Sequence, residues 1–205
     1  GRGVFPTRHP QFVGTYLGVA SPQSIRDIVE SSDCVLLLGE LVSDTSLGVS
    51  ANRLSEKNLL IAIARDVFIG HHRYQHAPLD RVLAHLLDAA SLPSGKPFVA
   101  PPAEPTENGL GSDDDQPIAM RHVIHRLNDF FGAHPDLLLV SDTGDCLFAS
   151  VDIQANEFIA PAYYATMGFS IPAALGVQIS SGRRPLVLVG DGAFQMTGPE
   201  ISHAG

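Results

Sequence analysis

The sequence predicts an α/β protein with two parallel-sheet, Rossmann-like domains, and three observations lead to this prediction. Apolar runs of strand length alternate with helical patterns, as expected of parallel strands covered by helices. This alternation restarts after a stretch rich in Pro, Gly and acidic residues. The composition, 44% hydrophobic and 17% charged over 205 residues, is globular and allows one large or two small domains.

The first domain is predicted over residues 1–91. Ser21 is a candidate cap for a helix that has Pro22 in its first position. Cys34–Leu38 then forms an unbroken apolar run, typical of a buried parallel strand, and Leu59–Ala64 repeats that pattern. An amphipathic helix follows these strands. No strand is predicted before the first helix, so we expect the domain to be N-terminally incomplete.

Residues 92–117 are predicted to link the two domains. Pro, Gly, Ser and acidic residues dominate this stretch, including Pro101–Pro102 and Asp113–Asp115. A segment with so few apolar side chains cannot offset its ordering entropy by burial, so we expect it to be exposed and partly mobile. The acidic run is interpreted as solvated charge rather than a metal cluster.

The second domain is predicted over residues 118–205. We expect a helix from about Pro117 to Phe131, a strand over Leu137–Val140, a helix from Ser170 to about Ser181 and a strand over Leu186–Val189. The last residues look like the first turns of another helix. Further elements would be needed to cover the edge of this sheet, so we expect this domain to be C-terminally incomplete.

Composition and charge exclude several classes of partner. A formal charge of −9 without a basic patch argues against nucleic acid and anionic membrane surfaces. The apolar runs are too short to span a membrane. Two cysteines, Cys34 and Cys146, are too few for a disulfide framework, which predicts a cytoplasmic protein. Cys146 has no base partner in the sequence pattern and is interpreted as a packed side chain.

The turn Gly190-Asp191-Gly192-Ala193 follows a predicted strand and is the best candidate site. Ligands bind at the carboxyl edge of open α/β sheets, where this turn would lie. Glycines let the backbone approach an anion, the amides of Gly192 and Ala193 can donate to phosphate oxygens, and the Asp191 carboxylate can ligate Mg²⁺. Taken alone, the tripeptide Gly190-Asp191-Gly192 is better explained as a plain tight turn after a strand.

A longer run around this turn resembles the thiamine diphosphate and Mg²⁺ motif of 2-oxo acid decarboxylases. Four other stretches are similar to the same family, two in each half of the chain. The five stretches are Val189–Glu200, Asp142–Phe148, Tyr163–Phe169, Phe12–Gly18 and Leu38–Thr45. By this resemblance, residues 1–91 are the central domain and residues 118–205 the diphosphate-binding domain.

The resemblance implies roles for particular residues. Asp191 would ligate the metal, and the cofactor-binding residues would be Gly144, Asp145, Ala165, Thr166, Met167, Gly190, Asp191, Gly192 and Ala193. Within this set, Ala165 would offer its backbone carbonyl to the aminopyrimidine and Met167 would lie beneath the cofactor. Without the family, Met167 is interpreted as a core methionine. Asp44 and Thr143 are substrate-side candidates.

For the intact enzyme, the resemblance implies non-oxidative decarboxylation of an aromatic 2-oxo acid, phenylpyruvate or indolepyruvate, to an aldehyde and CO₂. Thiamine diphosphate and Mg²⁺ are the implied cofactors, and a homodimer or homotetramer is the implied assembly. The activating glutamate of the family lies outside this chain, so the chain alone is expected to be inactive. A carboligase of the acetolactate synthase kind and a non-catalytic module that keeps the fold are the alternatives.

Two further patterns are assigned no function. His71-His72 resembles a histidine pair of these decarboxylases, but the family carries that pair in another domain, so we interpret it as part of a polar loop. No Gly-X-Gly-X-X-Gly turn follows a predicted strand, which argues against a nicotinamide-binding Rossmann protein.

Overall fold

The computed structural model describes residues 5, 7, 9–43, 54–89 and 117–204. The chain divides into two compact units: one contains Tyr16–Ala100, and the other combines Arg2–Thr15 with Pro101–Gly205. Most of the predicted linker, including its acidic run, lies outside the described residues, and so does Asp44. The predicted limits at residues 91 and 118 therefore stay predictions. No helix within the described ranges is long and apolar enough to cross a membrane.

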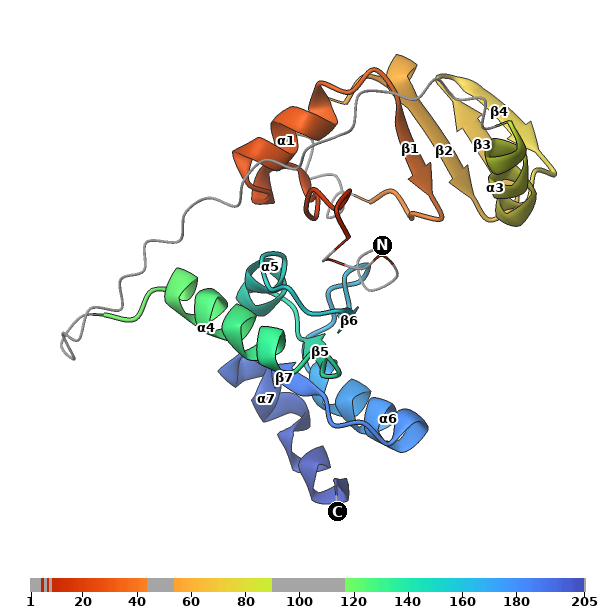
Figure 1. The fold of residues 1–205 in the computed structure, drawn as a ribbon. Coiled ribbons are helices and arrows are strands. Elements are labelled where there is room, and N and C mark those ends of the chain that lie inside the picture. Colours follow the sequence, from red (N-terminus) through yellow and green to blue (C-terminus); the bar gives the residue numbers. More distant parts are fainter. Residues whose placement is uncertain (1–4, 6, 8, 44–53, 90–116, 205) are drawn as a thin grey trace. The chain divides into compact units, whose positions relative to one another are not determined.

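The first unit contains a four-stranded sheet with the order β1-β2-β3-β4 (Figure 1). Strands β1 and β2 are parallel, with Val35 opposite Leu59, whereas β2–β3 and β3–β4 are antiparallel. Helix α3 packs against β2. The elements are η1 (Gly18–Ala20), α1 (Gln23–Glu30), β1 (Val35–Leu38), η2 (Glu56–Asn58), β2 (Leu59–Ile63), β3 (Asp66–Ile69), β4 (His72–Gln75) and α3 (Leu79–Asp88).

The α/β class is confirmed, but this sheet is mixed rather than purely parallel. The hairpin β3–β4 was not predicted, and in it His72 begins a strand instead of lying in a polar loop. All four residues of β4 are exposed, so the sequence has no alternating apolar pattern there that would predict a strand. The predicted cap was also wrong: α1 has no side-chain cap, and the Ser21 hydroxyl accepts the N–H of Leu17 instead.

Strand β1 also differs from the prediction of a buried strand. Leu36 and Leu38 are 43% and 38% exposed, and Cys34 is exposed as well. In the described part of the unit, β1 is an edge strand of the sheet and has only β2 beside it. An apolar run predicts that a strand forms. How deeply that strand is buried depends on the other strands and helices that pack around it, which the run does not predict.

The second unit is built on a fully parallel three-stranded sheet with the order β6-β5-β7. Hydrogen-bond register pairs Val140 of the central strand with Ile159 on one side and Val187 on the other. The elements are α4 (Met120–Ala133), β5 (Leu138–Ser141), α5 (Asp145–Ser150), β6 (Glu157–Ile159), α6 (Ser170–Ser181), β7 (Leu186–Leu188), α7 (Asp191–Thr197) and η3 (Gly198–His203).

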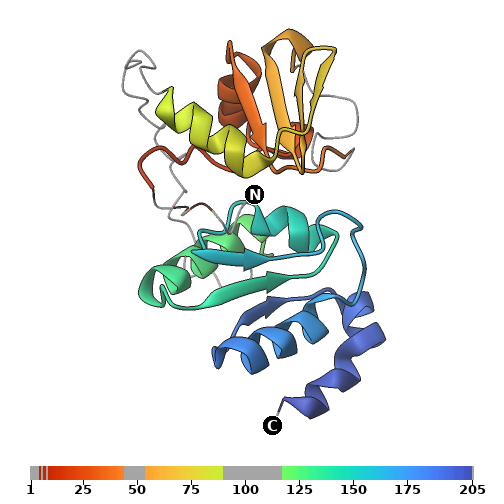
Figure 2. The ribbon, with the colours of Figure 1, turned by 90° about the vertical axis from the view of Figure 1, so that its right-hand side faces the viewer.

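Side chains of β5 alternate between two separate cores, one on each face of this sheet. Leu139 packs with Phe131 of α4, together with Ile153. Leu138 and Val140 face the other way and pack with Val177 of α6. Figure 2 shows α4 and α6 on opposite faces of the sheet. Because both faces are covered, all four residues of β5 are buried.

The helices predicted for this unit are present. The helix predicted from Pro117 to Phe131 begins at Met120 and ends at Ala133, and α6 spans Ser170–Ser181 as predicted. The last predicted helix begins earlier, at Asp191. Helix α5, which contains Cys146, and strand β6 were missed.

Candidate functional site

Three of the resembling stretches meet at the carboxyl edge of the second unit's sheet. Strands β5 and β7 are parallel neighbours, so the turns that follow them lie at the same edge. The N–H of Asp142, just after β5, donates to the carbonyl of Leu188 at the end of β7, at 2.8 Å. Hydrogen bonds join Gly168 and Ser170 to Asp142, and a further hydrogen bond joins Gly168 to Thr197 at the end of α7. This edge is where open α/β sheets bind ligands.

Asp142 is fully buried, and its carboxylate is at the centre of this arrangement. Oδ1 accepts the N–H groups of Thr143 and Gly168 at 3.0 and 3.1 Å. Oδ2 accepts the N–H of Ser170 at 2.9 Å. Burial by itself would raise the pKa of Asp142, but hydrogen bonds from Ser170, Thr143 and Gly168 outweigh it and hold the pKa below its ordinary value. The carboxylate is therefore ionised at neutral pH.

Gly168 joins the stretch Tyr163–Phe169 to the end of α7. Its φ of +81° is in the region that favours glycine, and a Cβ there would lie 3.0 Å from the Thr197 methyl group. The Thr197 hydroxyl donates to the Gly168 carbonyl at 2.9 Å. This residue is thus bonded through its N–H to the end of β5 and through its carbonyl to α7.

The Gly190–Ala193 turn lies as predicted, directly after β7. Asp191 is the first residue of α7 and is exposed, and its Oδ1 accepts the N–H of Gly192 at 2.8 Å. Ala193 is buried, and Gly192 is exposed. Within the described ranges, no group of three or more His, Cys, Asp or Glu could hold a metal ion. One exposed carboxylate next to backbone amides fits a Mg²⁺ ion whose other ligands are phosphate oxygens and water.

The remaining candidates lie on the surface near this edge. Ala165, Thr166 and Met167 are exposed, and Met167, at 57% exposure, is not the core methionine of the alternative interpretation. Ala165 has a φ of +51°, which is rare for a residue with a side chain. Gly144 caps α5 and Asp145 is its first residue. Both are exposed, whereas Thr143 is half-buried.

The charges at this edge are negative, which disfavours a thiolate. Burial, followed by the charges of Asp142 and Asp145, raises the pKa of the Cys146 thiol. Cys146 is therefore protonated at neutral pH and unsuited to be a nucleophile, in keeping with its interpretation as a packed residue. The same negative charge attracts a divalent cation.

The role of Asp142 was missed. The sequence shows an acidic residue directly after a buried strand, and that position was a usable signal. Its donors Gly168 and Ser170, however, are 26 and 28 residues further along the chain. No local pattern pairs a carboxylate with backbone amides so far away.

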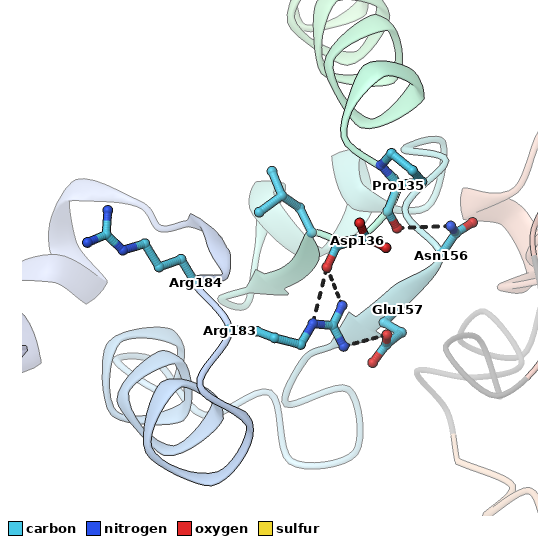
Figure 3. A pocket seen from close by; sticks show the side chains of 7 residues that line it. Pro135, Asp136, Asn156, Glu157, Arg183 and Arg184 are labelled. Carbon is cyan, nitrogen blue, oxygen red and sulfur yellow. Dashed lines mark hydrogen bonds and ion pairs between the residues drawn. The ribbon is translucent and has the colours of Figure 1, made fainter.

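A pocket of about 580 Å³ lies at the other edge of this sheet, where the strands begin (Figure 3). In it, the Arg183 guanidinium binds the Glu157 carboxylate at 2.6 Å and the Asp136 carbonyl. Figure 3 shows the Arg184 side chain directed away from this pair. The lining combines two arginines with two carboxylates and so has no excess charge that selects a ligand.

Two family models match the chain. Residues 1–88 match the thiamine pyrophosphate enzyme central domain, and residues 142–205 match the C-terminal thiamine pyrophosphate binding domain of the same enzymes. The second match contains all three stretches that meet at the carboxyl edge.

Curated relatives agree with this match. The chain is 40% identical over 207 residues to an indole-3-pyruvate decarboxylase of Azospirillum brasilense. The aligned region covers 99% of this chain and 37% of that protein. It is 28% identical to pyruvate decarboxylase 1 of Pisum sativum, over 98% of this chain and 35% of that protein. It is 27% identical to an alpha-keto-acid decarboxylase of Mycobacterium ulcerans, over 98% of this chain and 36% of that protein. The chain thus spans little more than a third of these relatives, and it belongs to the family of thiamine pyrophosphate-dependent 2-oxo acid decarboxylases.

Proposed function

We propose that this chain forms the central and cofactor-binding parts of a Mg²⁺-dependent, non-oxidative decarboxylase of aromatic 2-oxo acids. The observation that carries the proposal is the meeting of three stretches at one sheet edge: the Asp142–Asp145 turn, the Ala165–Gly168 segment and the Gly190–Ala193 turn. The aromatic substrate is supported by the 40% identity to an indole-3-pyruvate decarboxylase, compared with 28% to a pyruvate decarboxylase. Indolepyruvate and phenylpyruvate are the proposed substrates.

The residues at this edge fit a diphosphate cofactor with its metal. Asp191 has an exposed carboxylate for Mg²⁺, and the amides of Gly192 and Ala193 begin a helix next to it. The exposed Ala165–Met167 segment supplies a backbone carbonyl and an apolar side chain for the organic part of the cofactor. When bound, thiamine diphosphate supplies the nucleophilic carbon and the electron sink for loss of CO₂.

The chain's own part in this reaction is to bind and orient. Asp191 neutralises metal charge, and Met167 presents apolar surface that shields the reacting region from water. The left-handed backbone at Ala165, whose N–H donates to the Pro161 carbonyl at 2.7 Å, sets the direction in which its own carbonyl points. We propose that the intact enzyme works as a homodimer or homotetramer.

Cofactor binding is tested by calorimetric titration of thiamine diphosphate into the intact enzyme that contains this chain, with and without Mg²⁺. The Asp191→Ala variant should lose the Mg²⁺-dependent part of the binding. Asp129→Ala removes an exposed aspartate of α4 in the same unit and should bind like wild type. Equal binding by wild type and Asp191→Ala would contradict the metal assignment, and absence of binding to wild type would refute the proposal.

Substrate and reaction type are tested by product analysis with indolepyruvate, phenylpyruvate and pyruvate. Release of aryl acetaldehydes with kcat/KM at least about tenfold above that for pyruvate is expected if the site favours an aromatic group. Acetolactate or acetoin as the main product would identify a carboligase. Cofactor binding without turnover of any of these 2-oxo acids would support a non-catalytic module.

A further inference from the structure

We propose that Asp142 is a positioning residue, whose buried carboxylate fixes the Ala165–Gly168 segment in place at the cofactor edge. That this segment faces the cofactor rests on the proposed function. That Asp142 fixes the position of the segment is argued from hydrogen-bond geometry alone, and it can be tested independently of cofactor binding.

The carboxylate reaches across the chain to two backbone amides of the segment and the helix that follows it. Gly168 donates to Oδ1 at 3.1 Å and Ser170 donates to Oδ2 at 2.9 Å. Each oxygen therefore holds one of these amides. The Asp142 side chain has no exposure to solvent, so water cannot replace a lost hydrogen bond.

Ser170 shows why a carboxylate is needed at this place. It is the first residue of α6, and its N–H has no partner within the helix. A side chain from a preceding residue often fills this role, but Phe169 precedes α6 and no side-chain cap is present. Asp142 supplies the missing acceptor, and its negative charge lies at the helix end that favours it.

Gly168 connects this hydrogen-bonded arrangement to the C-terminal end of helix α7. Its carbonyl accepts the Thr197 hydroxyl at 2.9 Å, so the same residue is bonded to Asp142 on one side and to α7 on the other. Since α7 begins at Asp191, this chain of bonds connects the end of β5 with the proposed metal-binding helix. Loss of the hydrogen bonds to Asp142 should therefore let the Ala165–Met167 segment shift its position relative to Asp191.

An asparagine cannot replace this aspartate. A carboxylate offers two acceptor oxygens, whereas the amide of asparagine would direct N–H groups at one of the backbone donors. Asp142→Asn keeps the shape of the side chain and removes the charge. A buried hydroxyl elsewhere in the unit provides the matched control: Ser150 is also fully buried and donates to the Leu147 carbonyl at 2.7 Å, so Ser150→Ala removes a buried hydrogen bond away from the segment.

The first test is amide hydrogen exchange of the intact protein. In wild type, the N–H groups of Gly168 and Ser170 should be protected although they lie in a turn and at a helix start. In Asp142→Asn, both should exchange about 10- to 100-fold faster, the factor expected when a hydrogen bond to a charged group is lost. Ser150→Ala should leave them unchanged. Unprotected amides in wild type would overturn the proposal even if the Asn variant did not fold.

The second test measures cofactor affinity and kinetics of the same variants. Asp142→Asn should raise the Kd for thiamine diphosphate about tenfold or more and lower kcat, while the KM for the 2-oxo acid changes less. Faster exchange with a Kd equal to that of Ser150→Ala would overturn the positioning role. If wild type binds no cofactor, the proposed function fails, and the exchange data still decide whether Asp142 holds the segment.

Discussion

Alanine at Gly168 should destabilise the second unit by about 2 to 4 kcal/mol. A left-handed backbone costs a residue with a Cβ about 1 to 2 kcal/mol, and the φ of +81° lies in that region. The new methyl group would also lie 3.0 Å from the Thr197 methyl and 3.3 Å from the Met196 Cβ. Overpacking of this kind costs about 1 to 3 kcal/mol, and the smaller entropy of the unfolded alanine chain offsets up to about 1 kcal/mol.

Two further variants separate the backbone cost from the steric cost. Gly182 ends α6 with a φ of +68° and has open space where a Cβ would lie, so Gly182→Ala should cost only about 1 kcal/mol. In a Thr197→Ser background, the hydroxyl bond to Gly168 remains and the methyl in contact is gone. Gly168→Ala should then cost about 1 kcal/mol less than in wild type.

Urea unfolding followed by far-ultraviolet circular dichroism measures these differences, provided that the dependence on urea is the same for all variants. If Gly168→Ala costs no more than Gly182→Ala, the close contact with α7 is not present in solution. If the Thr197→Ser background gives no relief, the Thr197 methyl group does not contribute to the cost, which then comes from the backbone conformation and the contact with Met196.

Three other predictions concern charge. Asp142 contributes stability that is fully present above the ordinary aspartate pKa of 3.8 and is lost as the pH falls through its lower folded pKa. The unfolding free energies of wild type and Asp142→Asn should therefore converge in acid, and a constant difference would contradict this. The same substitution should shift the pH–rate midpoint of Cys146 alkylation to lower pH, with exposed Cys34 unchanged, because one of the charges that raise the Cys146 pKa is gone. Arg183→Met should cost only about 1 kcal/mol in unfolding by heat, since its pair with Glu157 is partly exposed, and a loss above 3 kcal/mol would contradict this.

Much of the fold could be predicted because it depends on local patterns. The run Leu186–Val189 ended by Gly190 predicted a strand, and β7 begins at Leu186 as expected, but the helix predicted near the end of the chain begins about six residues earlier, at Asp191. The apolar face from Met120 to Phe131 predicted α4 for the same reason. The position of the Gly190–Ala193 turn after a strand also predicted the sheet edge at which the structure has it.

The missed features depend on contacts between distant residues. Strand β4 consists of His72, Arg73, Tyr74 and Gln75, and it forms because β3 pairs with it rather than because an apolar face is buried. The exposure of Leu36 follows from the place of β1 in the sheet. Asp142 was visible as an acidic residue, but its partners are determined by how α6 packs on β5.

The second unit is discontinuous in sequence, and this affects the order in which it can form during synthesis. Residues 2–15 belong to the same compact unit as residues 101–205, and the Thr7 hydroxyl is 3.5 Å from the Ala155 carbonyl. The ribosome makes the whole first unit between these two parts. At a synthesis rate of about 5 to 20 residues per second, the residues of the second unit that residues 2–15 pack against are made on the order of 10 s later. Within the part of the protein that this chain represents, the second unit therefore completes its fold after the first unit has had time to form.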